Sequence, residues 1–297
     1  MSNTNLGRAL CAMVTPFTGT GALDLDAAQK LADRLVTEGC DGLVLSGTTG
    51  ESPTTSDTEK TELVRAVREA VDGRASVLTG VGTSDTRHTL DLARAAERAG
   101  ADGLLATAPA YSRPPQDAIA AHLWALADAT ELPVMVYDIP ARTGVRIEPD
   151  TLLRLAAHPR IAAVKDCAYD LLGTQKVMAA TDLAYYTGCD EYVLALYALG
   201  GAGYVSTVAN AVPGAFRAII DAYDAGDTAL AARHQQLTIP LTELMMSAGL
   251  PGAVTAKALL ADLSLPGGGP VRAPLLPADA PTVTRLRAAH DALVSAA

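Results

Sequence analysis

The sequence predicts an α/β fold, namely a (β/α)8 TIM barrel with a small C-terminal helical region. The chain has 297 residues, 49% of them hydrophobic and 19% charged, which is typical of a globular protein. This length suits two ordinary domains, or one barrel that folds as a single unit. Short apolar runs alternate with helical patterns, and polar motifs follow several of the runs. The alternation and the placement of the motifs favour the barrel, because barrel active sites lie at the carboxyl ends of the strands.

Eight short apolar runs are the expected strands. They are Leu10–Thr15, Gly42–Ser46, Ser76–Gly80, Gly103–Thr107, Pro133–Tyr137, Ile161–Lys165, Leu183–Thr187 and Gly203–Ser206. Their carboxyl ends fall 19 to 34 residues apart, which leaves room for one helix in each interval. Nearly continuous apolar strands of this length fit a parallel sheet that is covered on both faces.

Glycines and caps mark the ends of several expected helices. The segments Gly39–Leu45 and Gly100–Ala106 echo each other, since in each a glycine ends a helix and Asp-Gly leads into a strand. Ser56 and Glu59 form a capping box that opens a helix through Val71. A second helix begins near Asp85 and ends at Gly100. Repeated units of this kind support closure into a barrel.

About ninety residues follow the last expected strand. Helical patterns lie near Ala211–Ala225, Thr228–Ser247, Ala253–Leu263 and Pro281–Ser295, and the Pro-Gly-rich segment Leu265–Pro277 interrupts them. The first pattern can be the eighth barrel helix. We therefore expect a catalytic barrel over residues 1–225 and a C-terminal helical region over residues 226–297. A doubly wound sheet is the alternative fold, but Gly200-Gly201-Ala202-Gly203 has the wrong spacing for a dinucleotide-binding turn.

Composition excludes several classes of partner. A net charge of −10 and a pI near 4.9 argue against a nucleic-acid-binding protein, which needs a basic face. The N-terminal segment Met1–Leu10 has one arginine and no apolar stretch, so we expect no secretory signal. The segment Tyr192–Phe216 has no charged residue and is long enough for a membrane-spanning helix, but Gly, Ser, Thr, Asn and Pro residues interrupt it. We expect a buried helix and strand there, and no membrane partner.

The cysteines and histidines give no sign of a metal site. Cys11, Cys40, Cys167 and Cys189 are far apart and form no C-x-x-C motif, and the five histidines are scattered. We therefore expect neither zinc nor disulfides, no cofactor, and reduced thiols in a cytoplasmic protein.

Lys165 is the most informative single residue. The chain uses lysine only five times against eighteen arginines, and Lys165 ends the apolar strand Ile161–Lys165. One interpretation is a strand-end lysine that reaches solvent or pairs with Asp166. The other is a desolvated amine: a fall in pKa from about 10.4 to about 7.5 costs about 4 kcal/mol but supplies several hundred times more neutral amine at pH 7. A neutral amine is a nucleophile towards a carbonyl group.

Other polar residues converge on the same rim. The loop Gly47–Ser52 offers backbone N–H groups with the hydroxyls of Thr48 and Thr49, and is either a carboxylate cradle or a tight turn that caps the next helix. Tyr111, Tyr137 and Arg142 also follow strands, although each could be an ordinary strand-end or loop residue. With Lys165 they amount to a Schiff-base site for a keto acid, because phenols can pass protons and a guanidinium can hold a carboxylate.

Three motifs resemble a known family. They are Gly47-Thr48-Thr49-Gly50-Glu51-Ser52, Tyr137-Asp138-Ile139-Pro140-Ala141-Arg142-Thr143-Gly144 and Val164-Lys165-Asp166. In this order and spacing they look like the dihydrodipicolinate synthase (4-hydroxy-tetrahydrodipicolinate synthase) family, within the pyruvate-dependent class I aldolase superfamily that includes N-acetylneuraminate lyase. The resemblance runs along nearly the whole chain, from Ala12–Phe17 through Val205-Ser206.

The resemblance implies a lyase, usually a homotetramer built as a dimer of dimers, that condenses pyruvate with L-aspartate 4-semialdehyde in lysine and diaminopimelate biosynthesis. It implies that Lys165 forms the imine with pyruvate and that Tyr137, Thr48 and Tyr111 carry protons. The tyrosine that matches Tyr111 acts in a neighbouring subunit. The remaining implied positions bind substrate. Thr49 holds the pyruvate carboxylate with Thr48, Arg142 receives the carboxylate of the aldehyde, and the backbone at Gly188 and Val205 lines the imine.

Some positions depart from the family pattern. Asp138 replaces a frequent Asn, Ala110 replaces the first of a frequent Tyr pair, and Cys189 stands where an acidic residue is common. The alternatives are therefore a related pyruvate aldolase or lyase that acts on a different aldehyde or keto acid, and a non-catalytic keto-acid-binding paralogue. Lysine-inhibited members use histidines and a tyrosine where this chain has Asp57, Lys60 and Ala110, so we expect weak or absent feedback inhibition by lysine.

Overall fold

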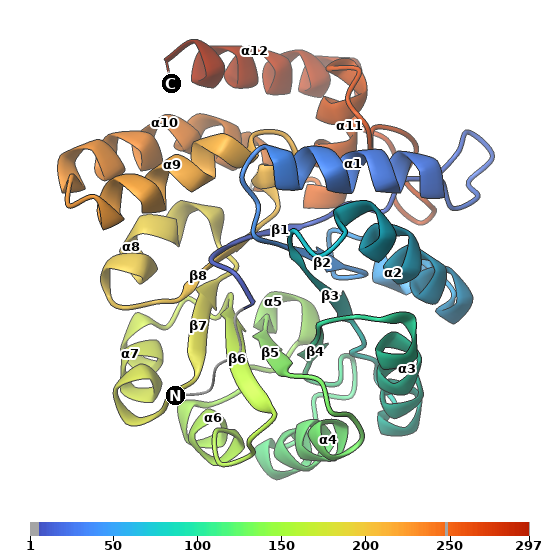
Figure 1. Ribbon diagram of the computed structural model, residues 1–297, viewed down its shortest axis with the longest axis vertical. Coiled ribbons are helices and arrows are strands. Elements are labelled where there is room, and N and C mark those ends of the chain that lie inside the picture. The colour runs from blue at the N-terminus through green and yellow to red at the C-terminus, as the bar shows by residue number, and fades with distance from the viewer. Residues whose placement is uncertain (1–5, 247–248, 297) are drawn as a thin grey trace.

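The computed structural model describes residues 6–246 and 249–296. Eight parallel strands form one closed barrel in chain order, with the last strand paired to the first (Figure 1). The strands are β1 Ala9–Ala12, β2 Gly42–Leu45, β3 Ser76–Gly80, β4 Gly103–Thr107, β5 Val134–Asp138, β6 Ile161–Asp166, β7 Ala184–Thr187 and β8 Gly203–Ser206. The (β/α)8 barrel expected from the sequence is confirmed.

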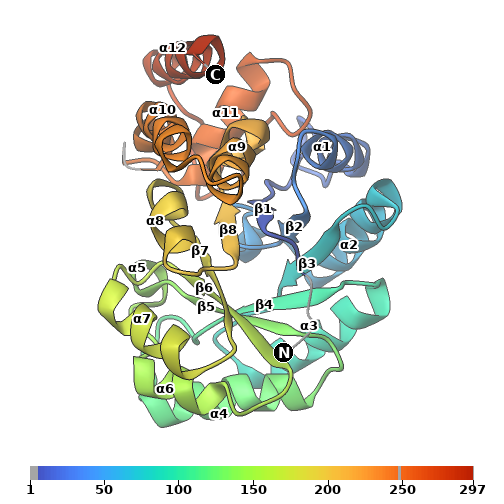
Figure 2. The same ribbon diagram turned by 60° about the vertical axis from the view of Figure 1, so that its left-hand side comes forward.

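Helices surround the barrel and continue beyond it. They are α1 Leu25–Thr37, α2 Asp57–Val71, α3 Thr86–Ala99, α4 Gln116–Asp128, α5 Pro140–Thr143, α6 Pro149–Leu155, α7 Leu171–Ala180, α8 Val193–Ala198, α9 Pro213–Asp224, α10 Thr228–Met246, α11 Gly252–Asp262 and α12 Ala280–Ala296. Three short 3-10 helices are η1 Ser52–Thr54, η2 Asp190–Tyr192 and η3 Val208–Asn210. In Figure 2 the helices α10, α11 and α12 form a group at one side of the barrel, next to α9.

The predicted caps are present. The Ser56 hydroxyl accepts the Glu59 N–H, the Glu59 carboxylate accepts the Ser56 N–H, and α2 ends at Val71 as expected. The echoed Asp-Gly pairs are equivalent too. Asp41 accepts a hydrogen bond from the Arg8 N–H beside β1, and Asp102 accepts one from the Val77 N–H of β3. Each aspartate therefore joins its own turn to the strand before it in the barrel.

The first strand is shorter than predicted: the Met13 N–H still donates to the Val44 carbonyl of β2, and the partners change after it. The N–H of Val14 donates to the Asn210 side chain, and the Thr15 hydroxyl donates to the Gly50 carbonyl, instead of continuing the ladder. The expected helix from Ala211 likewise begins only at Pro213, where proline suits the first turn. The pattern predicted for Thr228–Ser247 forms α10, and Ser247 lies outside the described residues.

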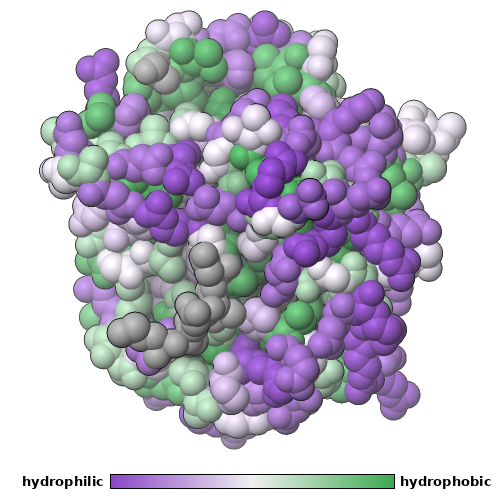
Figure 3. Space-filling view, viewed as in Figure 1, coloured by the Kyte–Doolittle hydropathy of each residue, from purple (hydrophilic) through white to green (hydrophobic). Residues whose placement is uncertain are grey.

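Two apolar layers make the core. The inner layer fills the barrel and contains Leu6, Leu10, Ala12, Val44, Leu78, Leu105, Met135, Tyr137, Ala163, Tyr186 and Val205. The outer layer lies between the strands and the helices. Among the described helices, none has both the length and the apolar character that a membrane crossing needs. Hydrophilic residues cover much of the face over α1, α2 and α3 in Figure 3.

Candidate active site

Lys165 lies inside the barrel. It follows Ala163 by two residues on β6, so the alternation of side chains along a strand directs it to the same interior. Its side chain is buried, with 5% of its surface exposed, and its Nζ lies 4.3 Å from the centre of the Tyr137 ring, on the opposite residue of β5. Burial lowers the pKa of the Lys165 amine, and the nearby Cys167 and Asp190 oppose part of that decrease. The pKa is therefore shifted in the direction that a Schiff-base nucleophile needs.

A second buried lysine provides a contrast. Lys257 on α11 is 1% exposed, and its Nζ donates to Glu51 Oε1 at 2.5 Å and to the Pro270 carbonyl at 2.9 Å. Burial lowers the pKa of Lys257 as well, but its carboxylate partner opposes this. Lys165 has no carboxylate within ion-pair distance among the described residues. Lys165 and Lys257 are therefore similarly buried, but only Lys257 is paired with a carboxylate.

Tyr137 joins Lys165 to the loop after β2. The Tyr137 phenol is buried, the Thr48 side chain is near enough to affect its pKa, and its Oη lies 4.0 Å from Cys167 Sγ. Burial raises the pKa of Tyr137 well above its usual value. A phenol that stays protonated at neutral pH can donate a proton to a developing anion. The structure thus brings together Lys165, Tyr137 and Thr48.

The loop after β2 is held in a tight conformation. The N–H of Glu51 donates to the Thr48 carbonyl at 3.2 Å, and Ser46 and Glu51 have φ angles of 51° and 53°, in the left-handed region. The Thr49 hydroxyl is buried and lies 2.8 Å from the Thr207 hydroxyl after β8. Thr48, the residue before Thr49, is exposed.

Sequence reasoning missed the group that supports this loop. Glu51 is buried, and besides Lys257 it accepts the Arg272 N–H at 2.8 Å. The Arg272 guanidinium binds the Glu59 carboxylate, and the cations of Lys257 and Arg272 each lie 4.0 Å from the Phe17 ring centre. We call Glu51, Lys257 and Arg272 the loop clamp. The Pro-Gly-rich segment, whose role the sequence left open, supplies Arg272 to it. The one available signal was Lys257, a rare lysine inside an apolar helix.

Gly188 and Val205 lie beside the amine. The Gly188 N–H donates to the Asp166 carbonyl at 2.8 Å, which extends the pairing of β6 with β7. A Cβ at Gly188 would lie 2.6 Å from Lys165 Cε and 2.4 Å from Cys167 Sγ, so a larger residue there would have to displace both side chains. Val205 is fully buried in the same inner layer as Tyr137.

Tyr111 and Arg142 do not contact Lys165 within the chain. Tyr111 is 97% exposed after β4, with a φ of 70°. Arg142, on the short helix α5, is exposed, and its guanidinium has no hydrogen-bond or ion-pair partner in the described part of the chain. Arg113 lies close to α5, since a Cβ at Gly144 would lie 2.8 Å from its Nε. This side of the mouth therefore carries exposed cationic side chains.

Two aspartates near the site residues are buried: Asp138 directly follows Tyr137 on β5, and Asp190 is close enough to Lys165 to affect its pKa. Asp138 at the end of β5 accepts the Ile147 N–H at 3.0 Å and lies opposite Asp166 on β6. Burial raises the pKa of Asp138 to about 7. Asp190 accepts the Ser206 hydroxyl, and burial raises its pKa to about 6. No three His, Cys, Asp or Glu side chains within residues 6–246 and 249–296 are grouped to hold a metal ion.

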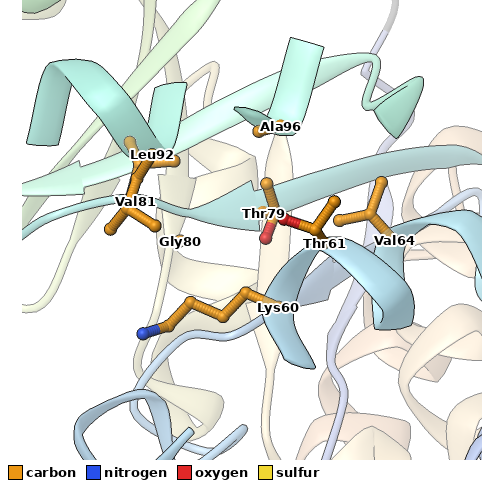
Figure 4. Close-up of a pocket in the computed structure, with 8 residues that line it drawn as sticks. All are labelled: Lys60, Thr61, Val64, Thr79, Gly80, Val81, Leu92 and Ala96. Carbon is orange, nitrogen blue, oxygen red and sulfur yellow. The ribbon is translucent and has the colours of Figure 1, made fainter. Parts of the chain in front are cut away.

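Small hollows also occur away from Lys165. The one in Figure 4 lies between α2, α3 and the end of β3 and is lined by Lys60, Thr61, Val64, Thr79, Gly80, Val81, Leu92 and Ala96. The Lys60 amine donates to the Thr55 carbonyl at 3.0 Å. Another hollow lies beside Asp138 and Arg146. Lys165 and Tyr137 line neither hollow.

Comparison with known proteins agrees with the resemblance seen in the sequence. The model of the Dihydrodipicolinate synthetase family matches residues 5–293. The chain is 71% identical to 4-hydroxy-tetrahydrodipicolinate synthase 1 of Streptomyces coelicolor, over 97% of this chain and 94% of that protein. A crystal structure of the synthase from Cyanidioschyzon merolae with lysine bound has a TM-score of 0.93 and 36% identity, covering 97% and 98% of the two chains. A structure described as a monomeric dihydrodipicolinate synthase variant has a TM-score of 0.93 and 31% identity, covering 99% of each.

Proposed function

Since this chain belongs to the dihydrodipicolinate synthetase family, we propose that it condenses pyruvate with L-aspartate 4-semialdehyde to give 4-hydroxy-tetrahydrodipicolinate. It is then a lyase of lysine and diaminopimelate biosynthesis that works through a Schiff base. The observation that carries this proposal is Lys165, a buried amine beside a buried phenol with no carboxylate partner in the described chain. The lowered pKa of Lys165 supports its role as nucleophile.

In the proposed reaction the neutral Lys165 amine adds to the keto carbon of pyruvate, and loss of water gives the imine. A methyl proton is then removed, and the resulting enamine carbon attacks the aldehyde carbon. The Tyr137 phenol donates a proton to the new alkoxide and is reprotonated through Thr48 and Tyr111. The effect of the Thr48 side chain on the pKa of Tyr137 supports the first part of this relay, because it requires the two groups to be close.

The proposed substrate contacts lie on opposite sides of the mouth. Thr48 and Thr49 bind the pyruvate carboxylate, while the backbone at Gly188 and Val205 lines the imine. Arg142 binds the carboxylate of the aldehyde. Its exposed guanidinium, free of ion pairs in the described chain, supports this role, because it has all its donors available.

We also propose a homotetramer built as a dimer of dimers, in which Tyr111 completes a neighbour's site. A 97% exposed tyrosine in a left-handed conformation supports this, because its phenol projects away from its own barrel. Apolar side chains on α7, α8 and the turns beside them are also exposed and offer a second contact surface. They are Tyr169, Leu171, Leu172, Tyr192 and Leu199.

Three further expectations remain proposals. The first divides the chain into a barrel of residues 1–225 and a helical region of residues 226–297. The second is a cytoplasmic location, which four free cysteines support because free thiols suit a reducing compartment. The third is weak or absent feedback inhibition by lysine. Asp57 is already paired with His88, at 2.9 Å, so its carboxylate is occupied. The Lys60 amine, which donates to the Thr55 carbonyl, carries a positive charge and would repel the ammonium group of a lysine ligand. Half-inhibition by low millimolar lysine would contradict it.

Borohydride trapping tests the function. Reduction in the presence of pyruvate should add one reduced pyruvyl group to Lys165 and abolish activity, and Lys165→Ala should prevent the adduct. Lys257, equally buried but paired with Glu51, is the matched internal control and should stay unmodified. Pyruvate that leaves Lys165 unmodified would overturn the mechanism. A panel of aldehydes then tests the alternative of a related aldolase, which would form the same adduct but consume aspartate semialdehyde slowly.

A further inference from the structure

Two thiols lie beside the reactive amine. Cys167 follows β6 two residues after Lys165, and Cys189 follows β7 directly after Gly188. The sulfur of Cys167 is 4.0 Å from the Tyr137 oxygen. A Cβ built on Gly188 would lie 2.4 Å from that sulfur and 2.6 Å from Lys165 Cε, so the thiol and the lysine side chain share one face of Gly188. The chemistry assigned to the site uses neither thiol.

The strand register places the two cysteines within reach of each other. Asp166 lies opposite Thr187, and the next bond runs from the Gly188 N–H to the Asp166 carbonyl. Cys167 is therefore opposite Gly188 and one residue short of Cys189. A strand spacing of about 4.8 Å and a rise of about 3.3 Å put the two Cα atoms about 6 Å apart. Disulfides bridge Cα separations of about 4.4 to 6.8 Å. Each thiol also shifts the pKa of the other, which agrees with their being neighbours.

The two thiols differ in reactivity. Cys167 is partly exposed, whereas Cys189 is 7% exposed. The neighbouring Cys189 thiol and the Lys165 amine lower the pKa of the Cys167 thiol, while the Cys167 thiol and burial raise the pKa of Cys189. The thiolate is the nucleophilic form. Cys167 is therefore the thiol that attacks, and Cys189 the one that resolves the product.

A second cysteine pair in the chain is a natural control. Cys11 and Cys40 also interact, but both are buried, and burial raises the pKa of Cys11 well above its usual value. That pair lies in the outer apolar layer, away from the barrel mouth. Proximity is thus common to both pairs, and only Cys167 combines it with access to solvent.

We propose that Cys167 and Cys189 are an oxidative modification site, at which a hydroperoxide forms a disulfide that crosses the active site and stops imine formation. The Cys167 thiolate attacks one peroxide oxygen, the O–O bond breaks, and the departing oxide takes up a proton, which leaves a sulfenic acid. The Cys189 sulfur then attacks the Cys167 sulfur, the S–O bond breaks, and hydroxide leaves with the Cys189 proton as water. The two thiols lose two electrons and the peroxide gains them. A dithiol reverses the change by exchange.

The disulfide would alter the site through two contacts. The sulfur of Cys167 would turn from Tyr137 towards Cys189, and the backbone at Gly188, which packs on Lys165, lies directly before Cys189. Cross-linking the segments after β6 and β7 would fix both on the pyruvate side of the mouth. We therefore expect the oxidised chain to lose its ability to form the pyruvate imine.

Peroxide treatment of the full chain tests this. Mass spectrometry of unreduced peptides should find a Cys167–Cys189 cross-link with the loss of two hydrogens, and Cys11 and Cys40 should stay as thiols in the same sample. The borohydride adduct on Lys165 and the activity should fall in proportion to the cross-linked fraction, and dithiothreitol should restore both. Cys189→Ala, measured against its own untreated activity, should form no cross-link and should not recover with dithiothreitol, since its sulfenic acid has no resolving thiol.

Two results would overturn the proposal. One is peroxide that oxidises the chain without linking Cys167 to Cys189. The other is a cross-linked chain that still forms the adduct at the untreated level. The effect on imine formation rests on the proposed function, whereas the cross-link does not. A chain that lacks the adduct even before oxidation contradicts the function, and the peptide masses still decide the modification.

Discussion

Glu51 and Asp138 are both buried carboxylates at the carboxyl ends of barrel strands, but only Glu51 has a cation against it. On the β2 side, the loop clamp joins Glu51 to Lys257 and Arg272 of the C-terminal region. On the β5 side, Asp138 has no ion-pair partner in the described chain, and its pKa rises to about 7. Nearby, Tyr111 and Arg142 are exposed.

On one half of the barrel mouth the polar side chains are paired within the chain, whereas on the other half several side chains have no partner in the described chain. The β2 side has its polar groups paired before any substrate arrives, which suits a cradle for the small pyruvate carboxylate. The β4 and β5 side offers unpaired donors that a substrate or a neighbouring subunit can engage. Variants of the loop clamp should therefore affect stability most, variants of the exposed Tyr111 and Arg142 should affect turnover or binding, and a variant of the buried Asp138 should affect the pH dependence of stability.

The largest effect is expected from Lys257→Met. Removing one partner of a buried ion pair leaves Glu51 as an uncompensated charge, which costs about 3–5 kcal/mol of unfolding free energy. Urea unfolding measures it, and the pyruvate KM should rise as the Thr48 loop loses its support. Arg287→Ala, which breaks the exposed pairs with Asp262 and Asp291, is the control and should cost about 0–1 kcal/mol. Equal losses in the two variants would contradict the clamp. Glu51→Gln combined with Lys257→Met should be less destabilised than Lys257→Met alone, because no buried charge is left unpaired.

Tyr111→Phe should leave unfolding unchanged, because the side chain is 97% exposed, and lower kcat about 10²-fold, the usual loss for one proton-transfer group. Mixed assemblies sharpen the test. Chains carrying Tyr111→Phe and chains carrying Lys165→Ala should recover activity when unfolded and refolded together, since a mixed pair contains one site with both intact residues. Two inactive variants that stay inactive after mixing would place Tyr111 outside the neighbour's site.

Asp138→Asn should change the pH dependence of stability. The native pKa of about 7 lies above the ordinary value of 3.8, so the folded state binds the proton more tightly, and stability falls as pH rises between those values. The full shift corresponds to about 4 kcal/mol, and relaxation around the charge should reduce it to about 2 kcal/mol. Asparagine cannot ionise, so the variant should gain stability over the native chain at pH 8 relative to pH 4. Urea unfolding of both chains at pH 4 and pH 8 measures this gain. If the stability difference between the variant and the native chain is the same at both pH values, the pKa of Asp138 is not raised in the folded protein.

The smallest effect is expected from Arg142→Lys. The lysine keeps the charge but loses the two-pronged geometry for a carboxylate, so the KM for the aldehyde should rise about tenfold, or about 1.4 kcal/mol. Pyruvate adduct formation at Lys165 should be unaffected. A matching rise in the pyruvate KM would mean that Arg142 serves the other substrate.

The sequence predicted the barrel and Lys165 because both depend on local patterns. Apolar runs identified the strands, and helix caps identified the ends of helices. Lys165 was recognisable because a lysine is unusual inside an apolar run. The loop clamp joins Glu51 to Lys257, which lie 206 positions apart, and no local pattern encodes that pairing. The pairing of Cys167 with Cys189 was likewise hidden, because it needs the register of β6 with β7. Local motifs therefore identified candidate residues, but which of these residues contact each other depends on the tertiary structure.

The loop clamp also limits how this protein can be recombined. The barrel and the C-terminal helices look separable along the chain, but the carboxylate of the clamp belongs to one and its cations to the other. A chimera that joins this barrel to another protein's C-terminal region would contain Glu51 without the Lys257 ammonium and the Arg272 N–H unless the new region supplies equivalent groups. The loop clamp should therefore be transferred as a whole, and a junction at residue 225 would separate Glu51 from Lys257 and Arg272.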